Sequence, residues 1–217
     1  MKKNSLKKLV IIGGGGYAKV VISIIKKIET YNIVGYTDLQ DQSEILGIPY
    51  LGNDDKFISE YHKYNVKDVF LGIGQLQDSN TKRRIVDKYR REGFNFPYII
   101  SPSAIIDDDV KIGEGSIIRD GAIVSCSTRI GNFSIIGTSV NVNHDSIVGD
   151  YCNIAIGSII GVNVIIFDQV FIGMGSTVIN NIKISNNIFV GAGSLVTRDC
   201  FKQGVYYGRP AKIIRDL

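Results

Sequence analysis

Residues 130–148 read IGNFSIIGTSVNVNHDSIV, and this stretch decides the fold of the second half of the chain. Isoleucine or valine stands at positions 130, 136, 142 and 148, so the aliphatic residues repeat every six positions. The repeat continues without a break from residue 106 to residue 196. A period of six fits neither an α-helix nor the simple alternation of a flat strand. It predicts a parallel β-helix of about five coils, in which each eighteen-residue coil has three short strands.

A second set of positions supports this prediction. Two residues before each aliphatic stands a small or β-branched residue, as at Ser134, Val140 and Ser146. Side chains two apart on a strand share a face, so these residues also point into the narrow interior. Glycine often follows the aliphatic, as at Gly131 and Gly149. We expect these glycines to supply the unusual backbone angles of the corners.

The first half of the chain has a different organisation. A buried strand is expected at residues 8–12, a glycine turn at 13–16, a helix at 17–29 and a second strand at 32–36. Further strands are expected at residues 48–51 and 68–73, and further helices at 54–64 and 79–91. This alternation predicts an α/β, Rossmann-like half-domain with a small parallel sheet. We place it at residues 1–102, followed by an all-β solenoid domain at 103–217 whose last twenty residues cap the open end.

Composition narrows the classes of function. The three cysteines are odd in number and scattered, which favours a reducing cytoplasm over a disulfide-bonded secreted protein. The apolar run before Gly13 is too short for a signal peptide or a membrane span, so we expect no membrane insertion. Residues 1–102 carry 16 Lys and Arg against 11 Asp and Glu. This mild excess suits an anionic ligand and is too weak to predict nucleic-acid binding.

The motif Gly13-x-Gly15-x-x-Ala18 fits the dinucleotide-type fingerprint, because it follows a strand and opens a helix. Glycine lets the backbone approach a phosphate, and the positive end of the helix dipole attracts its charge. Asp38 ends the second strand, where a carboxylate can hold a ribose hydroxyl. The motif predicts a nucleotide phosphate more firmly than NAD, and a purely structural glycine turn is the alternative.

Histidine is rare in this chain, with one residue in each half. His62 lies in a tyrosine-rich helical stretch and is expected at the surface. His144 lies on a solenoid corner, two residues after the inward Val142, and Asp145 follows it. An imidazole can take up a proton near neutral pH, and a neighbouring carboxylate stabilises the charged form. With one solenoid histidine, the three-histidine zinc site of some β-helix enzymes is not expected, and we predict no metal.

These features together resemble a known family. The hexads, His144-Asp145 and the tail Gly208-Arg209-Pro210-Ala211-Lys212 are similar to those of the left-handed β-helix, or hexapeptide-repeat, acyltransferases. Within them the chain resembles the sugar acetyltransferases of the sialic acid O-acetyltransferase and bacillosamine-pathway type. The glycine turn and Gly72-Ile73-Gly74 extend the resemblance into the first domain. The resemblance implies a left-handed coil, acetyl-CoA as co-substrate, and a homotrimer with active sites between adjacent solenoids.

The resemblance also implies roles for individual residues. His144 is the expected general base and Asp145 its partner, with backbone N–H groups of the next coil stabilising the oxyanion. Residues expected to contact acetyl-CoA are Asn153, Gly173, Gly191, Ala192, Pro210 and Lys212. Residues expected to bind the nucleotide-linked sugar are Gly13, Gly15, Gly16, Tyr17, Asp38 and Gly74. The chain departs from the family at Tyr17, Ser101 and Asn153, where histidine is usual, although an amide at position 153 can also donate a hydrogen bond.

The leading hypothesis is an acetyl-CoA-dependent N-acetyltransferase that acts on a nucleotide-linked 4-amino-deoxy sugar by direct transfer in a ternary complex. One alternative is O-acetylation of a sugar hydroxyl, as in sialic acid. Another is a non-catalytic β-helix binding protein, and a weaker one is NAD-dependent redox chemistry. The sequence leaves open which sugar and which nucleotide the protein uses.

Overall fold

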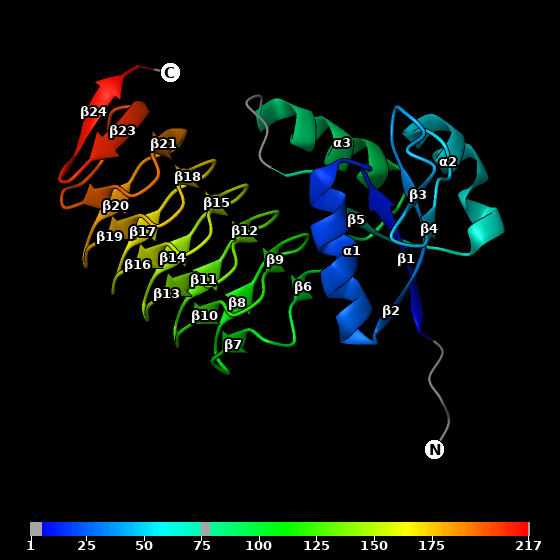
Figure 1. Cartoon of the computed structure of the whole chain (residues 1–217), viewed down its shortest axis with the longest axis horizontal. Helices are drawn as coiled ribbons and strands as arrows, with labels where there is room; N and C mark the ends of the chain where they lie inside the picture. The colour runs from blue at the N-terminus through cyan, green and yellow to red at the C-terminus, as the bar shows by residue number, and fades with distance from the viewer. Residues whose placement is uncertain (1–5, 75–78, 217) are drawn as a thin grey trace. The chain divides into compact units, whose positions relative to one another are not determined.

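The computed structural model describes residues 6–74 and 79–216, and these form two compact units (Figure 1). The first unit ends at Pro97 and the second begins at Tyr98. The boundary between the two units is therefore closer to the N-terminus than the boundary expected at residue 102. The reason is that strand β6 (Ile99–Ile100) already pairs with a solenoid strand, β9 (Ile117–Ile118).

The first unit contains a three-stranded parallel sheet in the order β2-β1-β5. Its elements are β1 (Lys7–Ile12), α1 (Gly16–Ile28), β2 (Tyr31–Thr37), β3 (Glu44–Ile45), β4 (Ile48–Pro49), α2 (Asp54–Glu60), the 3₁₀ helix η1 (Tyr61–Tyr64), β5 (Asp68–Leu71) and α3 (Ser79–Arg91). The β-α-β alternation is as predicted, whereas the β3–β4 hairpin was not foreseen. Leu9, Val10, Ile11 and Ile12 are fully buried, as expected for a central parallel strand covered on both faces.

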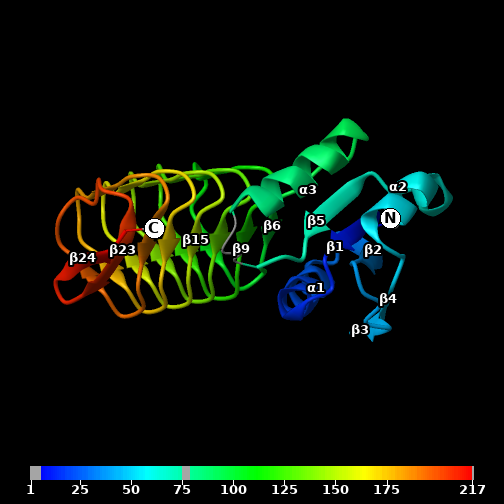
Figure 2. The same ribbon diagram turned by 90° about the horizontal axis from the view of Figure 1, so that it is seen from above.

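The second unit is a left-handed parallel β-helix with three faces (Figure 2). Face 1 consists of β7 (Ile105–Ile106), β10 (Ile123–Val124), β13 (Asn141–Val142), β16 (Ile159–Ile160), β19 (Thr177–Val178) and β22 (Leu195–Val196). Face 2 consists of β8 (Lys111–Ile112), β11 (Arg129–Ile130), β14 (Ile147–Val148), β17 (Ile165–Ile166) and β20 (Lys183–Ile184). Face 3 consists of β6, β9, β12 (Ile135–Ile136), β15 (Asn153–Ile154), β18 (Phe171–Ile172), β21 (Ile188–Val190), β23 (Gly204–Gly208) and β24 (Ala211–Arg215).

The predicted inward residues form the core of this solenoid. Each strand pairs in parallel with the strand one coil later, so Val124 pairs with Val142 and Val142 with Ile160. The aliphatic residue of every hexad from Ile118 to Val196 is at most 3% exposed. The companion positions are buried as well, including Ser134, Ser146 and Cys152. Cys152 is fully buried in this core, and its burial raises the pKa of the thiol to about 12.

The glycines that follow the aliphatics have a different role from the one expected. The positive φ angles of the corners fall two residues later, for example at Phe133 (55°) and Tyr151 (56°). Gly131 and Gly149 lack a positive φ. A Cβ atom on Gly131 would instead lie 2.6 Å from the carbonyl carbon of Gly149 in the next coil. The conformational explanation was therefore wrong, and close approach of the next backbone explains these glycines.

The tail closes one end of the solenoid with a hairpin of β23 and β24. β23 pairs in parallel with β21, and β24 returns antiparallel to β23. Tyr206 packs against the last core residues, while its neighbour Tyr207 faces outward. Among residues 6–74 and 79–216, no helix combines the length and apolar character needed to cross a membrane.

Candidate active site

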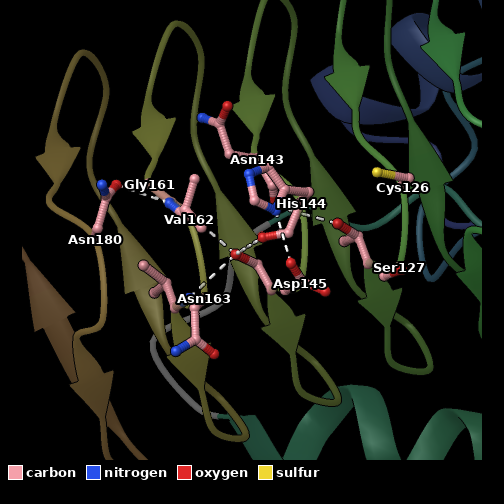
Figure 3. Close-up of polar contacts among 12 residues, drawn as sticks. Cys126, Ser127, Asn143, His144, Asp145, Gly161, Val162, Asn163 and Asn180 are labelled. Carbon is pink, nitrogen blue, oxygen red and sulfur yellow. Dashed lines mark hydrogen bonds and ion pairs between the residues drawn. The ribbon is translucent and has the colours of Figure 1, made fainter.

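His144 lies on the edge between face 1 and face 2, in the turn that joins β13 to β14. Cys126, His144, Val162 and Asn180 occupy the same place in successive coils, each eighteen residues after the last (Figure 3). Every turn of this column has the same backbone path, so only the side chains distinguish them. The repeat therefore places one imidazole on an otherwise uniform edge.

His144 and Asp145 form a close pair. His144 Nδ1 lies 2.6 Å from Asp145 Oδ2, and the two side chains are 48% and 58% exposed (Figure 3). Asp145 has a φ of 60°, a left-handed conformation that aspartate tolerates better than most residues. Because Nδ1 faces the carboxylate, Nε2 is the ring nitrogen left to accept a proton from a substrate.

Neighbouring coils hold the His144 turn in place. The Asp145 N–H donates to the Cys126 carbonyl at 3.2 Å, and the Asn163 N–H donates to the His144 carbonyl at 3.1 Å. Asn143 Nδ2 donates to the Ile160 carbonyl at 2.8 Å. Sequence reasoning missed these supporting residues. The eighteen-residue spacing was the signal that could have found Cys126 and Asn163.

The N–H groups of the next coil are already used within the chain. The four N–H groups of residues 161–164 donate, in order, to Val178 O (2.9 Å), Asn180 Oδ1 (2.9 Å), His144 O (3.1 Å) and Ser146 Oγ (3.1 Å). These donors are therefore committed to holding the coils together.

The residues expected to bind acetyl-CoA gather elsewhere on the solenoid. Asn153 points outward from face 3, whereas Gly173, Gly191 and Ala192 lie on the edge between face 3 and face 1. A Cβ on Gly173 would lie 2.5 Å from the Ala192 nitrogen, so these coils approach closely. Pro210 and Lys212 are exposed on the terminal hairpin. Within one chain, Gly173, Gly191 and Ala192 lie on the edge of face 1 opposite His144, so the fold does not bring the two groups together.

The glycine turn forms an open cradle at the carboxyl end of β1. Gly13 has a φ of 97° and is packed on Ile73, where a Cβ would lie 2.7 Å from Cγ1. Gly15 precedes α1, and Gly15 and Gly16 are exposed. A Cβ on either of these two glycines would meet no atom within 4 Å. The start of α1 therefore presents backbone to open space, as phosphate binding requires.

The remaining residues of the expected sugar site surround this turn. Asp38 Oδ2 accepts from the Gly14 N–H at 2.5 Å, and Oδ1 accepts from the Gln40 N–H at 3.1 Å. Asp38 thus holds the glycine turn in shape. Gly74 lies against Tyr17, whose Cβ is 3.3 Å from a Cβ built on the glycine. The structure therefore brings together the six residues expected to bind the nucleotide-linked sugar.

Known proteins are similar to this chain at two levels: a sequence family matches the first unit, and solved structures match nearly the whole chain. Residues 8–89 match the family described as the PglD N-terminal domain. No curated protein sequence matches the chain. A mutant of GDP-perosamine N-acetyltransferase from Caulobacter crescentus, in complex with CoA and GDP-perosamine, is 31% identical with a TM-score of 0.90. That match covers 98% of this chain and 99% of the other.

Two further solved structures are similar over nearly the whole chain. The acetyltransferase domain of PglB from Neisseria gonorrhoeae FA1090, in complex with acetyl coenzyme A, is 26% identical with a TM-score of 0.88. The match covers 97% of this chain and 100% of that domain. WeeI from Acinetobacter baumannii AYE has a TM-score of 0.85 at 24% identity, covering 96% and 100% of the two chains, and shows the shared fold.

The chain shares a Rossmann-like half-domain followed by a left-handed β-helix with these acetyltransferases, and this architecture places it among the acyltransferases. The chain belongs to the left-handed β-helix sugar N-acetyltransferases of the bacillosamine and perosamine type. Membership of this family makes it an acetyl-CoA-dependent sugar acetyltransferase.

Proposed function

We propose that the protein transfers an acetyl group from acetyl-CoA to the amino group of a nucleotide-linked 4-amino-deoxy sugar. The observation that carries this proposal is the His144–Asp145 pair, 2.6 Å apart on the solenoid edge. It occurs in a chain 31% identical to an enzyme crystallised with CoA and GDP-perosamine. This similarity favours N-acetylation over O-acetylation and over a non-catalytic role.

The proposed chemistry is direct transfer. The sugar amine attacks the thioester carbonyl, and His144 Nε2 takes the proton that the amine loses. Asp145 stabilises the resulting imidazolium through Nδ1. The tetrahedral intermediate then collapses and the C–S bond breaks. The His144 imidazolium gives its proton to the departing sulfur, so CoA leaves as the thiol and the neutral imidazole is restored. Holding both substrates in one complex supplies the proximity that the reaction needs, so no acyl-enzyme is formed.

We place the active site between copies of the chain in a homotrimer. Face 1 supports this arrangement, because its exposed outward residues include Ile105, Ile123 and Ile159 and no charged residue. Burying such a face favours association. Contact through face 1 can set the His144 edge of one copy beside the opposite edge of a neighbouring copy. In that arrangement, the His144–Asp145 pair of one copy lies close to the expected acetyl-CoA residues of its neighbour.

The neighbouring copy then supplies the acyl-donor contacts. The Asn153 amide is proposed to donate a hydrogen bond to the acetyl oxygen, replacing the histidine usual at this position. Gly173 and Ala192 line the path of the pantetheine arm, and Pro210 and Lys212 contact the CoA phosphate groups. This assignment also provides an oxyanion donor in place of the N–H groups at residues 161–164, which are already bonded.

The first unit is proposed to bind the nucleotide of the sugar substrate. Backbone N–H groups at Gly15 and Gly16 face the phosphates, and Asp38 faces the ribose. Tyr17 and Gly74 line the same cradle. We further propose a cytoplasmic location, which the three free cysteines support.

A thiol-release screen tests the proposal. The protein is incubated with acetyl-CoA and, in turn, UDP-, dTDP- and GDP-linked 4-amino sugars, and free CoA thiol is followed. The accepted sugar should yield an alkali-stable acetamide by mass spectrometry. His144→Ala should lower kcat by about 10²- to 10⁴-fold. Calorimetric CoA binding should be unchanged in this variant. Absence of thiol release with every sugar would contradict the proposal, and an alkali-labile product would identify O-acetylation instead.

A further inference from the structure

Asn141 is a polar residue in the middle of the apolar outer surface of face 1. It is the outward residue of β13, and the strands on either side place Ile123 and Ile159 beside it. Its amide oxygen Oδ1 is buried and has no hydrogen-bond partner among residues 6–74 and 79–216. Buried polar atoms in native proteins are almost always hydrogen-bonded, because water no longer solvates them. We therefore expect the partner of Asn141 to come from outside its own chain.

Arg119 is in the same position at the edge between face 3 and face 1. It lies in the turn that joins β9 to β10, and its Nε atom is also buried without a hydrogen-bond partner in the described part of the chain. The equivalent residues of the next three coils are Gly137, Ala155 and Gly173. Arg119 thus brings a cation to a column of the edge that is otherwise made of small residues.

Negative charge lies on the opposite edge of face 1. Asp107, Asp108 and Asp109 form the turn that joins β7 to β8. The outer two accept N–H groups of the next coil at 2.7 Å and 2.8 Å, and Asp108 between them is exposed. Fewer than eighteen residues separate Asp108 from Arg119, so the two lie within one coil of each other along the solenoid axis. Opposite charges on opposite edges suit a heterologous contact, in which one edge of a copy meets the other edge of the next.

We propose that neighbouring copies of this chain supply both missing partners. Three Asn141 amides form a closed ring on the three-fold axis of the trimer, in which Nδ2 of each copy donates to Oδ1 of the next. An amide both donates and accepts, so three groups related by the axis satisfy one another. The Arg119 guanidinium of each copy pairs with Asp108 of its neighbour. This inference rests on the homotrimer proposed above and assigns the residues that hold its copies in register.

The register matters for catalysis, and Asn141 acts as a positioning residue. It stands three residues before His144 on the same coil. Fixing the height of Asn141 on the axis therefore also fixes the height at which the His144 imidazole meets the neighbouring copy. Buried asparagines set register and the number of chains in coiled coils by the same physical means.

Asn141→Asp tests the amide ring, because it keeps the shape of the side chain and adds a titrating group. Its outward neighbours Ile123 and Ile159 carry no charge that could pair with it. At about pH 8 three ionised carboxylates repel one another on the axis, so the trimer should dissociate. At about pH 4.5 the clustered carboxyls, whose pKa values are raised by their mutual repulsion, regain a proton and can again donate and accept. The trimer should then return.

Asn187→Asp is the matched control, because Asn187 lies in the turn between face 2 and face 3. It should stay trimeric at both pH values, as should the wild type. Light scattering after size-exclusion chromatography gives each molar mass, and circular dichroism shows that each chain is folded. A trimer of Asn141→Asp at about pH 8, or dissociation of the control under the same conditions, would overturn the amide ring.

A charge exchange tests the pair between the edges. Arg119→Asp and Asp108→Arg should each raise the concentration at which half of the trimer dissociates by about tenfold. The double variant restores an opposite-charge pair and should recover the wild-type midpoint. Equal losses in the single and double variants would overturn this pair. Failure of the proposed function looks different: the wild type is a trimer with these effects, but no amino sugar is acetylated.

Discussion

The geometry of the His144–Asp145 pair follows from the place of each residue in its hexad. His144 is two residues after the buried Val142, and Asp145 takes the left-handed position that recurs every six residues from 115 to 193. Other corners place Ser127, Asn163 or Asn181 there, all with positive φ. Aspartate satisfies the backbone requirement of the turn and also carries the carboxylate that faces Nδ1.

Asp145→Asn separates these two roles. Asparagine tolerates the left-handed conformation, so the turn should keep its shape. The variant removes the charge that stabilises the imidazolium, and we expect kcat to fall by roughly 10- to 100-fold. Steady-state kinetics with the sugar identified in the screen measures this loss. The unfolding temperature should match that of the wild type, and an unchanged kcat would show that Asp145 does not assist His144.

At the scale of the coil, two kinds of glycine meet two different constraints. Gly131 has an ordinary φ but no room for a Cβ, because the backbone of the next coil is 2.6 Å from that position. Gly157 has a φ of 68° and open space around its Cβ position. Sequence alone could not distinguish the two, since both are glycines repeated within the same hexad frame.

Paired substitutions distinguish the two constraints. Gly131→Ala should lower the free energy of unfolding by about 1–3 kcal/mol, because the coils must move apart. Gly157→Asn should change it by less than about 0.5 kcal/mol, because Asn163 and Asn181 already hold the equivalent left-handed position. Urea denaturation followed by circular dichroism measures both. If both variants lowered the free energy of unfolding by similar amounts, packing between coils would not be the reason that position 131 is glycine.

At the scale of the whole molecule, face 1 and face 2 of the solenoid differ in charge. Face 1 presents Ile105, Ile123 and Ile159 outward, whereas face 2 presents Lys111, Arg129 and Lys183. Both faces have the same backbone and the same inward aliphatics. The difference between them lies in the outward residue of each strand, and it favours face 1 as the proposed contact between copies.

Ile159→Asp tests this assignment. A buried carboxylate without a partner is costly, so we expect the trimer to dissociate and activity to be lost. Ile147→Asp is the matched control, because Ile147 is 41% exposed on face 2 while Ile159 is 46% exposed on face 1. Light scattering after size-exclusion chromatography gives the molar mass of each variant. A monomeric wild type, or dissociation by both changes alike, would contradict an interface on face 1.

Most of the architecture was predictable because it depends on short-range periodicity. The hexads identified the solenoid and its inward residues, and the β-α-β pattern identified the parallel sheet. The candidate site was predictable only in part. Placing His144 on an exposed edge needed only its distance from Val142. Placing Asn153 half a coil away, on a different face, required the path of the chain around the prism.

By itself, the sequence determined the coil, its core and the corner on which His144 and Asp145 stand, because spacing along the chain sets which side chains face inward. Only the tertiary structure decided which N–H groups are already bonded, why Gly131 must be glycine, and that the Asn141 amide oxygen is buried. Those features depend on atoms from neighbouring coils. Their contacts arise from the packing of strands in space, which no local pattern specifies.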